Sequence, residues 1–296
     1  MMTELPTDCV LLVDKLVGPT SHDVVAQARR ALHTKRIGHT GTLDPFASGL
    51  LLLCVNRATR IAEYLTGLEK SYHAVARLDG TTDTDDHTGR MLERNEAWRT
   101  VSTPTVQSAL AEIQSHDEQV PPAFSAKKVR GDRAYELARA GATVDLAPVR
   151  VRISELSLVR FDPPDVEFTM SCSSGTYVRA VARDLGRALG TGAYLTALRR
   201  TRIGRWSVAD ALPPARLAET ALPDSAVLEL SDALDFLPAV SVSDSDVQKL
   251  VHGQALTIAD LPDGDIVRAL AGGKLVALLR RTGEQLRPHK VLATVE

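Results

Sequence analysis

A short glycine-rich loop carries the residues best suited to chemistry, and it reads Gly38-His39-Thr40-Gly41-Thr42-Leu43-Asp44-Pro45. The proline after Asp44 favours an extended conformation at that aspartate, so its carboxylate would project from a rigid turn. Taken alone, an Asp-Pro pair in such a loop is usually only a turn. A phosphate-cradling loop would instead end in Gly-Lys-Ser/Thr, which this loop does not. The loop therefore offers one carboxylate for catalysis.

Further short sequence motifs precede and follow this loop, and their order and spacing along the chain are informative. They are Asp14-Lys15, Ala47-Ser48-Gly49, Lys70-Ser71-Tyr72, the run from Pro121 to Lys128 with Tyr135 and Ala138-Arg139-Ala140-Gly141, and the run from Cys172 to Arg179 with Leu198-Arg199-Arg200-Thr201. Over about residues 9–208 the chain thus resembles the TruB family of pseudouridine synthases. Leu16, Pro19 and Asp79 depart from the usual family residues beside the site. These departures could alter a turn, but they leave the catalytic positions filled.

The resemblance implies isomerisation of uridine to pseudouridine in transfer RNA, at position 55 of the T-arm, with Asp44 as the catalytic residue. This reaction breaks an N-glycosidic bond and rejoins the base through carbon, without redox change or loss of atoms. We therefore expect neither a cofactor nor a metal. Asp44 could add to the base, add to the sugar carbon or remove a sugar proton, and the sequence leaves all three paths open.

The resemblance also assigns the residues around Asp44. Burial opposes ionisation of a carboxylate, and Arg179 is the expected charge partner that offsets this cost. A uridine in a folded loop must be flipped out before it reacts; Tyr72 would stack on it, and its phenol could help move the C5 proton. His39 would occupy the space that the flipped base leaves in the RNA, and Leu198 would pack against the flipped base. Without the motif, Arg179 would be interpreted as an ordinary arginine on a solvated helix face, Tyr72 as a core residue and His39 as a surface residue.

Candidate phosphate contacts are Lys15, Lys127, Lys128 and Arg139. The net charge is −2, so attraction to RNA must come from local clusters. Basic residues gather at 29–36, 127–139 and 199–205. For each cluster the alternative is an ordinary solvated face.

Composition places the chain among ordinary folded proteins, with 44% hydrophobic and 24% charged residues in 296. Its apolar runs are too short for a membrane helix, and its first residues do not resemble a secretory signal. Cys9, Cys54 and Cys172 are odd in number and lack a CxxC pair, which indicates buried thiols in a reducing cytoplasm. We expect a cytoplasmic monomer that binds transfer RNA and needs no protein partner.

The hydrophobic patterns predict an α+β fold with a mixed, largely antiparallel sheet and flanking helices, because strands and helices alternate without a βαβ rhythm. Strands are expected at 9–14, 50–55, 71–78, 149–161 and 165–173, with a turn at 162–165 between the last two. Helices are expected after N-caps at Ser21 and Thr103, over 134–140 and over 176–189. Residues 37–49 are expected to form a loop.

Two domains are expected: a catalytic domain over 1–238, with an RNA-gripping insertion at about 120–148, and a small β-rich domain over 239–296. The acidic, proline-containing stretch 210–238 would lead into the second. Strands are expected there at 266–271, 275–279 and 291–295. The tail resembles the small RNA-binding PUA domain that closes many family members.

Two other functions are compatible with these features. A non-catalytic RNA-binding or RNA-folding protein would not need the carboxylate of Asp44, although such a role can coexist with catalysis. A guide-dependent synthase of the related ribonucleoprotein branch is the other alternative. The complete C-terminal block and the absence of long lysine-rich tails favour a stand-alone enzyme.

Overall fold

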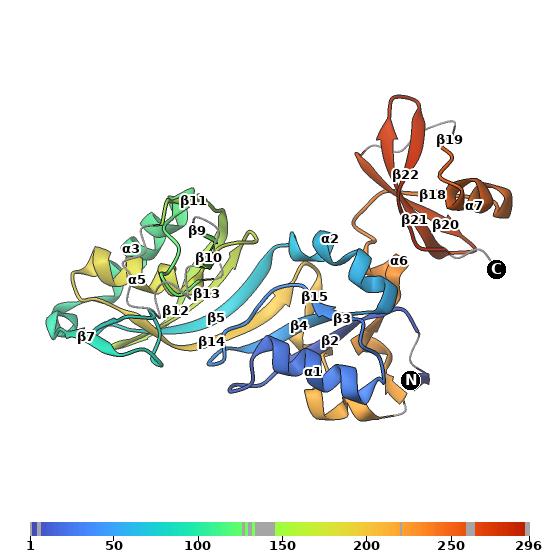
Figure 1. Ribbon diagram of the computed structural model, residues 1–296. Helices are drawn as coiled ribbons and strands as arrows, with labels where there is room; N and C mark the ends of the chain where they lie inside the picture. Colours follow the sequence, from blue (N-terminus) through green and yellow to red (C-terminus); the bar gives the residue numbers. More distant parts are fainter. Residues whose placement is uncertain are drawn as a thin grey trace.

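The computed structural model describes residues 2–4, 7–125, 128–129, 132–133, 146–219, 221–258 and 264–293, with side chains for all but 2–4, 128–129 and 132–133. An elongated α+β body is crossed by long strands, and a smaller β-rich unit lies beside one end of it (Figure 1). The predicted α+β fold is confirmed. In the described part of the chain, no helix has the length and apolar character needed to cross a membrane.

A nine-stranded sheet forms the body. The main path runs β12 (Ile153–Asp162), β13 (Asp165–Cys172), β5 (Lys70–Arg77), β14 (Tyr194–Ile203), β4 (Ser48–Val55), β2 (Cys9–Lys15) and β17 (Val227–Leu228), with β15 (Trp206–Ser207) on β14 and β3 (Ile37–His39) on β4. Neighbours are antiparallel apart from β14 and β4. Those two strands run parallel and pair at two positions, Arg199 with Ser48 and Arg200 with Gly49.

Two hydrophobic cores divide the body at this parallel junction. The first packs α1 (Ser21–Ala31) against β2 and β4. The second packs α3 (Thr103–Ser115) and α5 (Val178–Leu189) against β5, β12 and β13. Leu43 and Phe46 belong to the second core, whereas β4, which follows them, belongs to the first. The glycine-rich loop therefore crosses from one core to the other.

Helix starts differ from the predictions by one or two residues. Thr20 caps α1, because its hydroxyl accepts the N–H of Asp23 and its own N–H donates to that carboxylate. The predicted cap, Ser21, is the first helical residue and is buried. Likewise Ser102, rather than Thr103, caps α3. α5 begins at Val178, two residues later than expected. The helix predicted over 134–140 lies outside the described residues.

The predicted strands of the body are confirmed to within a few residues, and Asp162 and Asp165 close the expected turn. The expected loop over 37–49 was partly wrong, because its ends form β3 and the start of β4. Short antiparallel pairs join β1 (Met2–Glu4) to β16 (Ala221–Pro223), β6 (Gly80–Thr82) to β7 (Met91–Arg94), β8 (Glu118–Gln119) to β11 (Val149–Arg150), and β9 (Lys128–Val129) to β10 (Asp132–Arg133).

The acidic stretch 210–238 packs on the body. Leu212, Leu217 and Leu222 join the first core, and β17 pairs with β2. The short helix α6 (Leu230–Ala233) follows. The three cysteines are buried, and burial raises the pKa of Cys9 and Cys54 to about 12.

The C-terminal unit is a five-stranded sheet in the order β18 (Ala239–Ser241), β20 (Ile266–Ala271), β21 (Lys274–Thr282), β22 (Gln285–Val291) and β19 (Leu256–Thr257), with its own core. The structure adds helix α7 (Asp244–Val251), which was not predicted. The strand expected at 291–295 was wrong over 292–293, because β22 ends at Val291 and these two residues are not in a strand, whereas 294–295 lie outside the described residues.

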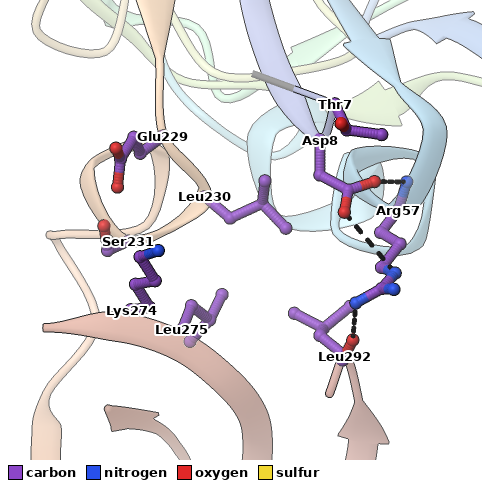
Figure 2. A pocket seen from close by; sticks show the side chains of 9 residues that line it. All are labelled: Thr7, Asp8, Arg57, Glu229, Leu230, Ser231, Lys274, Leu275 and Leu292. Carbon is purple, nitrogen blue, oxygen red and sulfur yellow. Dashed lines mark hydrogen bonds and ion pairs between the residues drawn. The ribbon is translucent and has the colours of Figure 1, made fainter. Parts of the chain in front are cut away.

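The two units meet at the short helical turn Asn56–Arg60 and helix α2 (Ala62–Thr66). Arg57 Nη1 donates to the carbonyl of Leu292 at 2.7 Å, and Lys290 Nζ donates to the carbonyl of Arg60 at 2.6 Å. A cavity of about 280 Å³ lies at this seam, where Arg57 also pairs with Asp8 (Figure 2). Its lining includes no residue of the glycine-rich loop.

Candidate active site

Buried hydrogen bonds fix the backbone on both sides of Asp44. The hydroxyl of Ser21 accepts the N–H of Leu43 at 2.8 Å and donates to the carbonyl of Leu43 at 3.1 Å. The N–H of Gly18 donates to the carbonyl of Pro45 at 2.8 Å. Leu43 and Phe46 insert into the second core. Asp44 therefore stands on a turn whose flanks are both held in place.

The side chain of Lys15 holds the same turn through hydrogen bonds to its backbone. Its side chain is fully buried, and Nζ donates to the carbonyls of Leu16, Asp44 and Ala47 at 3.0, 3.2 and 2.6 Å. Burial lowers the pKa of this lysine to about 8, although Asp44 opposes the shift. All three ammonium protons thus have protein acceptors. This position does not suit the phosphate contact expected from sequence, because a phosphate could reach the ammonium only after the loop moved.

Arg200 is a second buried cation behind the loop. Its Nε donates to the carbonyl of Leu50 at 2.7 Å, and its Nη2 donates to the carbonyl of Gly41 at 3.1 Å. Gly49 has φ +109°, and a Cβ there would lie 2.2 Å from the carbonyl oxygen of Arg200. A side chain at position 49 would therefore force β4 and β14 apart. The junction that positions the loop requires this glycine.

Arg179 meets Asp44 directly. Its Nε lies 2.9 Å from Asp44 Oδ2, and the arginine side chain is 7% exposed whereas the aspartate side chain is 35% exposed. Nη1 donates to the carbonyl of Thr84 at 2.9 Å, and Nη2 donates to the carbonyl of Phe124 at 3.0 Å. Two backbone carbonyls thus orient the guanidinium independently of its contact with the carboxylate. The partnership expected from the family resemblance is present.

A second carboxylate lies on the far side of this arginine. Asp86 is buried, and its Oδ2 lies 3.9 Å from Arg179 Nη1. Its Oδ1 accepts the N–H of Thr88. Arg179, Arg183 and Arg187 follow one another at four-residue spacing on α5, and their side-chain exposures of 7, 18 and 74% show that this row runs from the interior to the surface.

The pKa of Asp44 is raised above its ordinary value. Burial is the largest cause and Asp86 adds to it, whereas the charge and hydrogen bond of Arg179 and the charge of Lys15 oppose it. The carboxylate is therefore less stable in its ionised form than a solvated aspartate, and it depends on Arg179 for its charge. Such a shift is typical of residues at functional sites.

Tyr72 and Leu198 lie in the second core with the loop residues Leu43 and Phe46. Each is 8% exposed. Burial raises the pKa of Tyr72, and Arg200 opposes this without reversing it. The phenol is consequently neutral in the free protein, so it can donate a proton or present a ring face. It accepts a proton only after losing its own.

His39 is half-buried beside His22. Their rings meet edge to face with centroids 5.3 Å apart, and His39 Nδ1 accepts the N–H of Gly41 at 3.3 Å. Burial, His22 and Arg200 lower the pKa of His39 to about 4. The ring is therefore uncharged near neutral pH, which suits a side chain that replaces a base better than one that binds phosphate.

The other candidate phosphate contacts cannot be placed. Lys127, Arg139 and the side chain of Lys128 lie outside the described residues. In the basic cluster at 199–205, Arg200 is buried, Arg199 Nη2 lies 2.7 Å from Asp14 Oδ2, and Arg205 Nη2 lies 2.9 Å from Asp235 Oδ2. Arg202 is exposed and donates to the carbonyl of Arg205. The acids that pair with Arg199 and Arg205 come from distant parts of the chain.

Sequence reasoning missed three supporting residues: Ser21, Asp86 and Arg200. Ser21 was interpreted as a helix cap, and only the fold shows that it faces Leu43. Arg200 stands in a quoted motif, but its sequence neighbours gave no sign that it is buried. A signal for Asp86 was available, since three aspartates fall within residues 83–86 directly after a strand.

Comparison with known proteins assigns this arrangement to a family. A model described as "TruB family pseudouridylate synthase (N terminal domain)" matches residues 29–178, and one described as "tRNA Pseudouridine synthase II, C terminal" matches residues 237–293. The chain belongs to the TruB family. The first TruB match includes His39, Asp44 and Tyr72 and ends one residue before Arg179. TruB enzymes are isomerases, and the chain is a pseudouridine synthase by this membership.

Individual TruB relatives match along nearly the whole chain. The chain is 43% identical to "tRNA pseudouridine synthase B" of Mycobacterium sp. (strain KMS) over 96% of this chain and 95% of the relative. It is 41% identical to the protein of the same name from Thermobifida fusca (strain YX), over 97% and 99%. Among solved structures, a Cbf5-Nop10-Gar1 complex matches with a TM-score of 0.72 and 25% identity, covering 96% of this chain and 85% of that chain.

Proposed function

We propose that this protein converts the uridine at position 55 of the transfer RNA T-arm to pseudouridine, with Asp44 as the catalytic carboxylate. The contact between Asp44 and Arg179 carries the proposal. It presents a one-third exposed carboxylate whose counter-charge is buried and already oriented. The names of the relatives from Mycobacterium and Thermobifida support transfer RNA as the substrate.

The neighbouring side chains divide the remaining work. The flipped uracil lies against the ring of Tyr72 and the side chain of Leu198, which border the loop in the second core. Neutral His39 occupies the space that the base leaves. Asp44 adds to the base, adds to the sugar carbon or removes a sugar proton, and all three routes require its ionised form. Once the base has been rejoined through carbon, the C5 proton leaves to solvent, and the Tyr72 phenol takes part only as a relay that passes its own proton to water while it takes this one.

We further propose that residues 1–238 form the catalytic domain and that 239–296 add RNA contacts. A purely RNA-binding role would not explain why Arg179 and Asp86 are buried around Asp44, since a carboxylate opposes phosphate binding. A guide-dependent role has weaker support. The likeness to the Cbf5 complex is at 25% identity, against 43% for a relative named as a transfer RNA enzyme.

The test compares Asp44→Asn with Asp162→Asn, a control at an aspartate that is 73% exposed. Each purified protein is incubated with an unmodified transfer RNA transcript, and pseudouridine is mapped along the RNA. Wild type and control should modify position 55 without added guide RNA. Asp44→Asn should form no product yet bind RNA within about tenfold of wild type, because one carboxylate contributes little to binding a polyanion. Product from Asp44→Asn within tenfold of wild type would refute the catalytic assignment, and modification at another position would refute the substrate.

A further inference from the structure

Two adjacent aliphatic side chains stand in solvent beside the Asp44 loop. Leu16 is 57% exposed and Val17 is 64% exposed. Among the described residues, the other large hydrophobic side chains exposed to this degree are scattered singly along the chain. Isolated exposed apolar residues are normal, but a contiguous pair next to a functional loop suggests a contact surface.

The backbone beneath this pair is held rigidly to the loop. Lys15 Nζ donates to the carbonyl of Leu16 and also to that of Asp44, so one buried ammonium joins the two segments. The N–H of Gly18 donates to the carbonyl of Pro45 at 2.8 Å. Leu16 and Val17 therefore keep a constant position relative to the catalytic carboxylate even though their side chains contact water.

Both neutral and acidic groups lie next to this pair. Gly18, Pro19 and Thr20 connect the pair to α1, whose first turn carries His22 and the exposed Asp23, and His22 packs edge to face on His39. His39 is uncharged near neutral pH, because its pKa is lowered to about 4 by burial and by the charges of His22 and Arg200. In Figure 1 the segment before α1 and the segment after β3 extend along the same side of the body. An apolar pair that precedes an exposed carboxylate fits the face of a base better than a phosphate.

We propose that Leu16 and Val17 form an apolar ledge that packs against the base of a nucleotide adjoining the target uridine. Flipping the uridine removes a stacking partner from its neighbours and leaves a base face exposed. Aliphatic side chains are known to cover such faces when nucleic acid is unstacked. The ledge lowers the cost of holding the RNA open while Asp44 reacts. This inference rests on the proposed function, because it requires an RNA whose uridine is flipped.

The test is a double-mutant cycle between protein and RNA. The variant Leu16→Ser/Val17→Ser is compared with Leu92→Ser/Val159→Ser, whose parent side chains are 57% and 53% exposed and lie on β7 and β12. Both are assayed on a T-arm hairpin and on hairpins in which the 5′ or the 3′ neighbour of the target is abasic. The half-saturating RNA concentration is measured in single-turnover reactions, and thermal unfolding checks that each variant is folded.

On the intact hairpin, the ledge variant should need about tenfold more RNA for half-saturation, a loss near the lower end of that found when an aromatic side chain stacked on a base is removed. On one of the two abasic hairpins this difference from wild type should largely disappear. The control variant should match wild type throughout. An unchanged half-saturation on the intact hairpin, or an equal loss on all three hairpins, would overturn the ledge while leaving the proposed function intact. A wild-type protein that forms no pseudouridine in the intact hairpin would overturn both.

Discussion

Arg179 Nε lies 2.9 Å from Asp44 Oδ2, and the arginine is the buried member of the pair whereas the aspartate faces outward. The carbonyls of Thr84 and Phe124 orient the guanidinium, so its position does not depend on the aspartate. A charge fixed in this way needs no reorganisation when substrate arrives, which is the property that makes preorganised groups effective. The carboxylate that we propose to be catalytic is accessible to RNA, whereas its counter-charge is buried.

Replacing Arg179 by lysine should lower the single-turnover rate by about 10²-fold or more, as found when a preorganised donor is removed. Lysine keeps the charge but cannot bind Asp44 and two carbonyls at once. The unsatisfied carbonyls should also cost about 1–3 kcal/mol of unfolding free energy. Arg187→Lys is the control, because that side chain lies two turns further along α5 and is 74% exposed. Near-normal rates for Arg179→Lys would show that charge alone is sufficient.

The rate should fall as pH is lowered, with a midpoint above 3.8, the ordinary pKa of aspartate. The sign follows from the ionised form being required: burial raises the pKa of Asp44, so protonation inactivates it at a higher pH than it would in solvent. Asp86→Asn should move this acid limb to lower pH, because Asp86 raises the pKa of Asp44. Arg179→Met should move it to higher pH. The measurement is the single-turnover rate against pH at saturating RNA, and shifts in the same direction for both variants would contradict the electrostatic account.

Lys15→Met should lower the rate by about 10- to 100-fold, because small displacements of a reacting group are costly. The three carbonyls now bound by Nζ would lose their donor, and the turn that carries Asp44 would loosen. Because the ammonium is buried, the salt dependence of RNA binding should stay as in wild type. A slope reduced by about one unit would instead identify Lys15 as a phosphate contact, in agreement with the original sequence-based prediction.

Changing Lys127, Lys128, Arg130 and Arg133 to alanine should weaken RNA binding and flatten its salt dependence, because fewer counterions would be released. The single-turnover rate at saturating RNA should fall much less. Arg90, Arg99 and Arg160 each pair with a nearby acid, so their replacement serves as a control. An unchanged salt slope would exclude phosphate contacts by the 127–133 segment. A collapsed rate with normal affinity would place these residues in the chemistry instead.

The strands and helices of the body could be predicted because their hydrophobic patterns are local. β13 alternates from Val166 to Cys172, and α5 has a continuous buried face. Helix caps were harder to predict, because adjacent residues such as Thr20 and Ser21 are both able to cap. The structure decides between them through Leu43, which is more than twenty positions away and binds Ser21.

The distinction between local patterns, which could be predicted, and long-range contacts, which could not, also applies to the site. The motif identified Asp44, Tyr72 and Arg179, and family resemblance supplied their expected roles. The support for these residues could not be predicted from spacing, because it comes from long-range packing. The ion pair of Arg199 with Asp14 and the burial of Arg200 both depend on β14 lying beside β4. Of the arginines that suggest an RNA surface in the sequence, Arg200 is therefore internal and Arg199 is paired with an acid, although Arg199 and Arg205 remain partly exposed.

The parallel junction of β4 and β14 is also the place where the two halves of the body could bend relative to each other. The backbones of these two strands pair at two residue positions there, side-chain bonds from Arg199 and Arg200 add to the contact, and the Asp44 loop spans the same place. Bending is easiest where backbone bonding is sparse. Asp44 stands where the halves join, because Leu43 and Phe46 beside it pack in the second core with Tyr72, whereas Lys15 and Ser21 hold the loop backbone from the first half. An RNA that contacts both halves would fix the angle between them, and with it the alignment of Asp44 with the side chains that we propose to act beside it.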